Sequence, residues 1–119
     1  MADARRYETL DGSMINELLH PKHDRVRGMS IAEATVAAGG RTHPHRHRAG
    51  EEVYYTLSGE GVLQLGARTE HMLPGSIHLI EPGVDHSVTA FTEAPLRFLC
   101  VTTPPYSHED TELTSPVEA

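Results

Sequence analysis

The chain has 119 residues and one cysteine, Cys100, so it is long enough for one domain with its own core and cannot form an internal disulfide framework. Its formal net charge is −7, which makes a nucleic-acid partner unexpected because phosphate binding requires a basic face. No apolar run approaches the ~20 residues of a membrane span and the first residues lack the apolar stretch of a signal peptide, so no membrane association and a cytoplasmic location are expected.

Frequent turn signals divide the chain into short segments that are rich in β-branched and apolar residues. Segment 13–19 fits either a strand or a short helix, and Pro21 ends it in both cases. Beyond it, strands are predicted at 29–36, 53–57, 62–65, 76–80, 86–90 and 96–101. Short strands between Gly- and Pro-containing turns are typical of an all-β sandwich or barrel, here as a single domain.

The stretch from Gly39 to Gly59 carries the residues of a candidate metal site. His45 and His47 are separated by one residue, so on a strand both side chains face the same way, roughly 7 Å apart. Glu52 lies an odd number of residues further on, and a continuous strand would turn it to the other face. A bend is therefore predicted at 48–51, where Gly50 suits it, and His86 follows as a distant third histidine.

The stretch resembles the first motif of the cupin family, G-x5-H-x-H-x(3 or 4)-E-x6-G, and matches it at every fixed position. The second cupin motif reads G-x5-P-x-G-x2-H-x3-N. Gly75, Gly83 and His86 match it, whereas Glu81 replaces the proline and Ala90 replaces the asparagine. The resemblance covers residues 29–102, and the two departures concern the shape of the pocket more than the ligands.

The resemblance implies an all-β, antiparallel double-stranded β-helix, the cupin jelly-roll barrel, over residues 29–103. Residues 1–28 would form an N-terminal arm on the barrel or on a dimer partner, because small cupins commonly pair into homodimers. Residues 104–119 would form an extended acidic tail that folds over a pocket, packs on a second subunit or lies on the surface. The implied ligands of one divalent transition metal per chain, Fe, Mn, Ni, Cu or Zn, are His45, His47, Glu52 and His86.

Two alternatives for the ligands stay open. His43 competes with His47 as the partner of His45, and Glu51 competes with Glu52 because the family tolerates the shorter spacing. Glu52 is preferred since it keeps the distance to Gly59. Tyr54, which shares the face of Glu52, is a candidate catalytic proton donor, and its alternative role is that of a core tyrosine with its hydroxyl at the rim.

The remaining polar residues give weaker signals. A basic cluster of Arg41, Arg46 and Arg48 either binds a small anion or is solvated. Outward surface positions are expected for three further residues that are otherwise candidates for contacting the ligands or substrate: Gln64, His78 and Arg97. Cys100 is expected to be a buried, unreactive small side chain.

Three functions fit this sequence, and all of them involve a small molecule. The first is a metal-dependent oxidoreductase of dioxygenase type that acts on an oxygenated or anionic molecule, since four protein ligands leave room for substrate on the ion. The second is a redox-neutral isomerase, cyclase or lyase in which the metal is a Lewis acid. The third is a non-catalytic module that binds a small ligand or a metal. The first function is slightly preferred over the other two, because oxidative chemistry is the more frequent one in the cupin family.

Overall fold

The computed structural model describes residues 5–114, and this part of the chain is built almost entirely from short strands. Their bounds are β1 Arg6–Glu8, β2 Met14–Leu19, β3 Ser30–Val36, β4 His45–His47, β5 Glu51–Ser58, β6 Gly61–Leu65, β7 Arg68–Met72, β8 Ile77–Ile80, β9 His86–Ala90, β10 Leu96–Thr103 and β11 Thr111–Leu113. A short 3-10 helix, η1 His108–Asp110, precedes β11.

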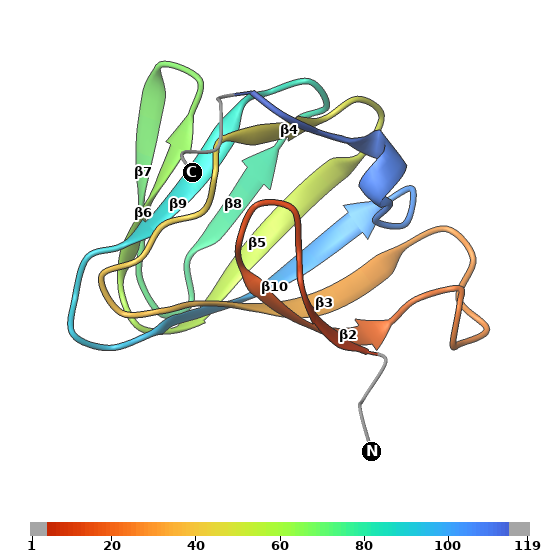
Figure 1. Cartoon of the computed structure of the whole chain (residues 1–119), viewed down its shortest axis with the longest axis horizontal. Coiled ribbons are helices and arrows are strands. Elements are labelled where there is room, and N and C mark those ends of the chain that lie inside the picture. Colours follow the sequence, from red (N-terminus) through yellow and green to blue (C-terminus); the bar gives the residue numbers. More distant parts are fainter. Residues whose placement is uncertain (1–4, 115–119) are drawn as a thin grey trace.

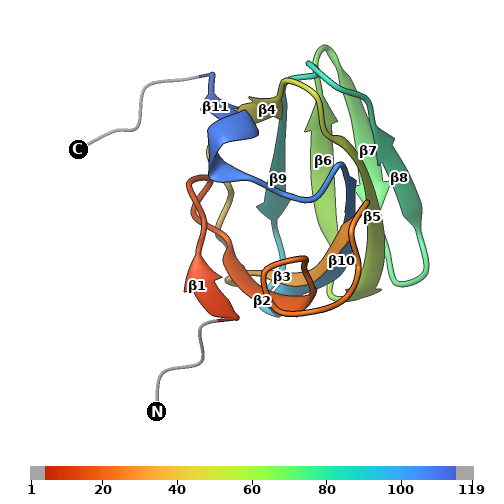
Figure 2. The same cartoon turned by 90° about the vertical axis from the view of Figure 1, so that its right-hand side faces the viewer.

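The strands form two antiparallel sheets that face each other (Figures 1 and 2). One sheet has the order β1-β2-β3-β10-β5-β8, and the other has the order β11-β4-β9-β6-β7. Neighbours in each sheet are often far apart in sequence, as in the pairing of β10 with both β3 and β5. This is the double-stranded β-helix that the sequence predicts, in a single domain. No helix of the described part of the chain is long and apolar enough to cross a membrane.

The core lies between the two sheets, where side chains from alternate strand positions meet. On β10, for example, Leu96 and Phe98 are buried whereas Arg97 is exposed. The buried apolar side chains are Ala34, Val36, Tyr54, Leu63, Leu65, Met72, Ile80, Val88, Ala90, Leu96 and Phe98. Their alternation with exposed positions explains why a period of two marks these segments in the sequence.

Gly59 shows why one motif glycine is needed. It ends the β5 hairpin with a φ of +82°, which L side chains rarely adopt, and a Cβ there would lie 2.3 Å from the carbonyl oxygen of Pro95. The neighbouring strand can therefore approach closely only because residue 59 has no side chain.

The six strands predicted from the sequence are confirmed, with ends that shift by up to two residues. The ambiguous segment 13–19 forms strand β2, because pairing with β3 satisfies its backbone. Three short strands were not predicted: β1, β7 and β11. They escaped prediction because β7, with the sequence RTEHM, is mostly exposed and polar, and the other two have only three residues each.

The segments on either side of the predicted barrel both lie against it. Strand β2 extends the six-stranded sheet beside β3, and the β1–β2 hairpin lies below the open end of the barrel in Figure 2. After β10, the chain crosses this end, forms η1 and adds β11 to the edge of β4. Thus the first residues of the predicted acidic tail, up to Thr114, contain ordered elements, and the rest of it lies outside the described residues.

Candidate metal centre

Three strands bring the four predicted ligands together inside the barrel. His45 and His47 lie on β4, Glu52 lies near the start of β5, and His86 begins β9 beside His45. All four side chains are buried, and one ligand atom from each lies within 4.8 Å of the others. The cluster is thus positioned to bind a metal ion.

A bend between β4 and β5 turns Glu52 to the same side as the histidines. The chain bends at Arg48 and Ala49, as the spacing predicts. Asp110 of η1 holds this bend, because its carboxylate accepts hydrogen bonds from the backbone N–H groups of Ala49 and Gly50, each at 2.9 Å. The bend shifts the alternation by one residue, so Glu52 is buried while Glu51 is exposed.

Each histidine of the cluster is oriented through its Nδ1 atom. Nδ1 lies 2.9 Å from a backbone carbonyl oxygen in His45 and in His86, with His43 and Val84 as the respective acceptors. In His47 the partner is the hydroxyl of Thr111 at 3.0 Å. That hydroxyl donates to the carbonyl of Ser107, so its lone pair is free to accept from His47.

With a proton on each Nδ1, the Nε2 atoms of the neutral imidazoles carry lone pairs, as metal-binding histidines do. The carboxylate oxygen Oε1 of Glu52 lies 2.8 Å from Nε2 of His47 and 3.4 Å from Nε2 of His86. Acceptor atoms at these distances require a cation between them, either a proton or a metal ion.

Two buried atoms of the cluster have no hydrogen-bond partner among the described residues, Oε1 of Glu52 and Nε2 of His86. Unpaired buried polar atoms are rare and costly. The second oxygen of Glu52 is satisfied, because Thr102 donates to it at 3.0 Å. The unpaired atoms are thus the ones that face the other ligands, which is the arrangement that a divalent ion would satisfy.

The electrostatics without a metal fit the same picture. Burial raises the pKa of Glu52, but the imidazoles of His47 and His86 beside it outweigh burial and hold the pKa well below its usual range. Burial lowers the pKa of His47, and the bond and charge of Glu52 reverse this into a net rise. For His45, burial and then the charge of His86 lower the pKa. Glu52 therefore stays ionised and ready to bind a cation.

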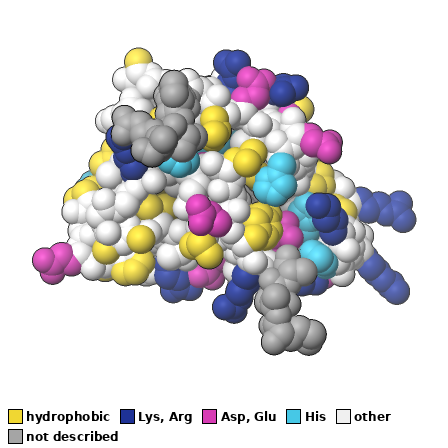
Figure 3. Space-filling view, in the orientation of Figure 1, with side chains coloured by type: hydrophobic (Ala, Val, Ile, Leu, Met, Phe, Trp, Pro, Cys, Tyr) yellow, Lys and Arg dark blue, Asp and Glu magenta, His cyan; other side chains and the backbone are white. Residues whose placement is uncertain are grey.

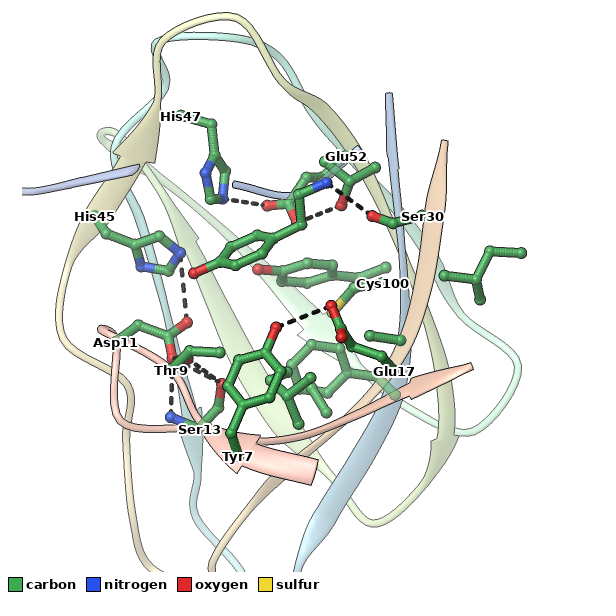
Figure 4. A pocket seen from close by; sticks show the side chains of 18 residues that line it. Tyr7, Thr9, Asp11, Ser13, Glu17, Ser30, His45, His47, Glu52 and Cys100 are labelled. Carbon is green, nitrogen blue, oxygen red and sulfur yellow. Dashed lines mark hydrogen bonds and ion pairs between the residues drawn. The ribbon is translucent and has the colours of Figure 1, made fainter. Parts of the chain in front are cut away.

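The cluster opens into a cavity between the N-terminal hairpin and the inner face of the barrel, with about 510 Å³ of empty space that includes its mouth toward solvent (Figure 4). Its walls include Ile15, Ala34 and Phe98, together with Tyr106 from the segment that follows β10. The segment that follows β10 thus contributes one side chain to the wall of the cavity. The apolar walls suit a small molecule.

Asp11 brings a further carboxylate to the metal end of the cavity. It lies in the loop of the β1–β2 hairpin, and its Oδ2 atom is 3.4 Å from Nε2 of His45. The other oxygen, Oδ1, is held by Thr9 and by the backbone and hydroxyl of Ser13. Asp11 therefore points at the same atom of His45 that would bind a metal (Figure 4).

Three residues of the site were missed from the sequence: Asp11, Tyr106 and Thr111. They belong to the two terminal segments, far from both motifs. Asp11 and Tyr106 line the cavity, and the pairing of β11 with β4 brings Thr111 to His47. Thr9-x-Asp11-x-Ser13, where a carboxylate is held by neighbouring hydroxyls, was the available local signal, and it indicates a turn rather than a site.

The ligand alternatives separate clearly in the structure. Glu51 points outward, and His43 offers its backbone carbonyl to His45 instead of its ring. Tyr54 is buried, lines the cavity and packs on Phe98 with ring centroids 4.6 Å apart. Burial, followed by the charge of Glu52, raises the pKa of Tyr54 well above its usual value, so its phenol stays protonated.

The arginines lie away from the cavity. Arg46 and Arg48 both pair with Glu112 on the outside of β4, where they are exposed, and Arg41 is exposed as well. In the space-filling view, Lys and Arg side chains project around the edges of the face shown rather than gathering into one patch (Figure 3). Burial raises the pKa of the Cys100 thiol well above its usual value, which agrees with an unreactive side chain.

Of the three residues expected on the surface, Gln64 and Arg97 are exposed as predicted, but the prediction for His78 is wrong. His78 is 6% exposed, whereas its neighbours Ile77 and Leu79 face outward. The buried ring is tolerated because Glu70 contacts Nδ1 at 2.6 Å and Ser76 contacts Nε2 at 2.8 Å. Strand alternation predicts that His78 and Ile77 face opposite sides of the sheet, but it does not say which of the two sides is buried.

Comparison with known proteins agrees with this fold. The family model of the Cupin domain matches residues 32–102. The uncharacterized protein MJ1618 of Methanocaldococcus jannaschii is 42% identical over 107 residues, which cover 90% of this chain and 86% of that protein. L-ectoine synthase of Vibrio cholerae is 30% identical over 107 residues, which cover 88% of this chain and 74% of the enzyme.

Solved structures show the same architecture. The polyketide cyclase RemF from Streptomyces resistomycificus superposes with a TM-score of 0.75 at 24% identity, over 99% of this chain and 79% of that chain. At this identity the likeness concerns the fold alone.

Proposed function

The chain belongs to the cupin family, and from this premise we propose that it is a metal-dependent enzyme that acts on a small oxygenated molecule. The observation that carries the proposal is the buried cluster of His45, His47, Glu52 and His86, in which Glu52 Oε1 and His86 Nε2 are unpaired beside a partly enclosed cavity. The relation to an enzyme, L-ectoine synthase, supports catalysis over simple binding.

The four residues would hold one divalent transition metal through three imidazoles and one carboxylate. Such a donor set suits Fe, Mn, Ni, Cu or Zn, and a bound ion would polarise a substrate oxygen as a Lewis acid or, if redox-active, would support oxidation of the substrate by dioxygen. Around it, Thr102, Thr111 and two backbone carbonyls fix the ligands, so the geometry is set before the ion binds. The apolar walls exclude water from the reacting group.

The finer proposal is oxidative chemistry of dioxygenase type, with Tyr54 as a proton donor to the bound molecule. The donor set supports it because imidazole and carboxylate together suit Fe(II). Tyr54 lines the cavity and keeps its proton, so it can donate a hydrogen bond to an oxygen of the substrate.

Redox-neutral chemistry is the second candidate, and the polar groups of the cavity favour it. Asp11, Tyr7 and Tyr106 line the same space as Tyr54 and provide acceptors and donors of protons beyond the ligands. An isomerase, cyclase or lyase needs such groups to move protons while the metal acts as a Lewis acid.

Oxygen uptake separates the two candidates. Iron-loaded protein would be assayed with an oxygen electrode on a panel of enols, diketones and thiols, and turnover of the same panel would be followed anaerobically with Zn(II) or Ni(II). Substrate-dependent oxygen consumption is the expected result. Turnover that is unchanged without oxygen would select redox-neutral chemistry, and no turnover under either condition with metal bound would identify a binding module.

We also propose that the protein is a homodimer that packs through the outer face of its six-stranded sheet. This face is unusually apolar at β8 and β5, where Ile77, Leu79 and Tyr55 are 67%, 48% and 39% exposed. Cross-strand pairing places Leu79 beside Val53 and Ile77 beside Tyr55, so the side chains form one continuous patch. Light scattering should give twice the chain mass for the wild type and the single-chain mass for Leu79→Asp.

A further inference from the structure

The cavity beside the metal cluster contains two carboxylates outside the ligand set and no Lys or Arg side chain among its described lining residues. Both acids, Asp11 and Glu17, come from the N-terminal hairpin. Figure 4 shows Asp11 next to His45, and Glu17 on the other side of the cavity near Cys100. One end of the cavity therefore has Asp11 beside the metal ligand His45, and the other end has the carboxylate of Glu17.

Glu17 is a buried acid that its surroundings satisfy only in part. It is 8% exposed on β2, and the hydroxyl of Tyr7 donates to its Oε2 atom at 3.1 Å. His20 lies close but is committed elsewhere, because its Nε2 contacts the carbonyl of Tyr106 at 3.0 Å and its Nδ1 accepts from the backbone of Lys22. Both ring nitrogens of His20 are thus used in contacts with other groups.

The remaining contact of Glu17 in the described structure is looser. Nε2 of His23 lies 3.5 Å from Oε1 of Glu17, and the His23 side chain is 28% exposed to solvent. A buried carboxylate is costly unless a cation or several donors compensate it. Glu17 is thus able to accept a further charged donor from inside the cavity.

The charges along the cavity favour a cation at the Glu17 end. A divalent ion in the cluster would be balanced by Glu52 and by Asp11, which lies beside His45. The negative charge of Glu17 is left over at the other end. The cavity is also lined by apolar side chains, including Ile15, Ala34 and Phe98, against which a short aliphatic chain would pack.

We propose that the ligand of this cavity is a small molecule with a primary ammonium group, which Glu17 binds, and an oxygen-bearing group that faces the metal cluster. Tyr7 positions Glu17 through its hydroxyl. The proposal rests on the proposed function, since it assigns the substrate class of the same site. It keeps an oxygenated or anionic group at the metal end and adds a cationic group at the far end.

Isothermal titration calorimetry of the metal-loaded full chain tests the proposal. The probes are ω-amino acids of four to six carbons, each compared with the ω-hydroxy acid and the dicarboxylic acid of equal length. An ammonium–carboxylate hydrogen bond is worth enough that the best amino acid should bind about tenfold or more tighter than its hydroxy analogue. Glu17→Gln should abolish this preference, and the surface control Glu33→Gln should keep it.

Metal content is measured on the same samples, so that the two proposals fail separately. If the wild type holds its ion but the hydroxy acids or dicarboxylic acids bind as tightly as the amino acids, or no amino acid of the series binds, the ammonium proposal is overturned and the metal proposal stands. If no ion binds, the proposed function fails first. The comparison of probes on the wild type needs no variant, so it holds even where Glu17→Gln does not fold.

Discussion

Two clusters in the same barrel each pair buried histidine with glutamate, and they differ in how completely their polar atoms are satisfied. In the first, His78 contacts Glu70 and Ser76 through both ring nitrogens, and Ser76 also donates to Thr56 at 3.0 Å. In the second, the metal centre, Glu52 Oε1 and His86 Nε2 have no partner among the described residues.

The comparison teaches how to distinguish a structural histidine from a ligand. The His78 cluster is complete without any added group, so its role is to hold β7 and β8 together. At the metal centre every Nδ1 is satisfied by the protein while the Nε2 side converges on one carboxylate oxygen. The glutamates differ in exposure, 30% for Glu70 and 4% for Glu52, and the direction of the unsatisfied atoms separates the clusters further.

The largest expected effect is that of His47→Ala, which removes a ligand. Loss of a residue that only orients a ligand typically lowers metal affinity by about 10- to 100-fold, and loss of a ligand itself should lower it further. Activity should disappear while the β-core persists. Metal per chain and circular dichroism check this. Full occupancy in the variant would show that the ligand set is wrong, and His43 would be the next residue to substitute.

His78→Ala is the matched change in the other cluster. It leaves Glu70 and Ser76 without their buried partner, so the free energy of unfolding should fall by about 1–3 kcal/mol. Metal content should equal that of the wild type. Urea unfolding and elemental analysis of one preparation measure both quantities, and a loss of metal without a loss of stability would reverse the assignment of the two clusters.

Asp11→Asn tests whether the metal centre extends beyond its four ligands. The amide can keep the hydrogen bonds of Oδ1 with Thr9 and Ser13, but it turns an N–H group toward His45 in place of the carboxylate oxygen. Metal affinity should fall by about tenfold, as for other residues that surround a ligand set. Competition with a chelator of known affinity measures it, and unchanged affinity would remove Asp11 from the site.

The smallest expected effect concerns the acid stability of the metal-free protein. The lowered pKa of Glu52 means that its contribution to stability is present above its unfolded pKa, about 4.3, and is lost as pH falls through the folded value. The wild type should therefore lose its advantage over Glu52→Gln, of the order of 1 kcal/mol, as pH falls below about 4. Urea unfolding in chelator from pH 7 to 3 checks this, and a difference that is independent of pH would contradict it.

Sequence patterns predicted the barrel and the four residues of the cluster, because strand alternation and fixed motif spacing are local properties. His45 and His47 share a face by alternation, and the bend before Glu52 follows from its odd spacing. Whether a metal binds there is not decided by that spacing and stays a prediction.

The rest of the site depends on contacts between distant segments. Asp11, Glu17 and Tyr106 reach the cavity only because β2 pairs with β3 and the chain after β10 crosses the open end. His78 was misplaced for a related reason, since Ile77 and Leu79 look like core residues until the sheet packing turns them outward. Periodicity shows which side chains of a strand share a face of the sheet, and only tertiary packing determines which of the two faces is buried.

The central claim is tested most directly by elemental analysis of the protein, purified without chelators or a nickel column, beside the variants His47→Ala and His78→Ala. The account predicts about one divalent transition metal per chain in the wild type and in His78→Ala, and almost none in His47→Ala. No metal in the wild type even after reloading, or equal metal in both variants, would contradict it.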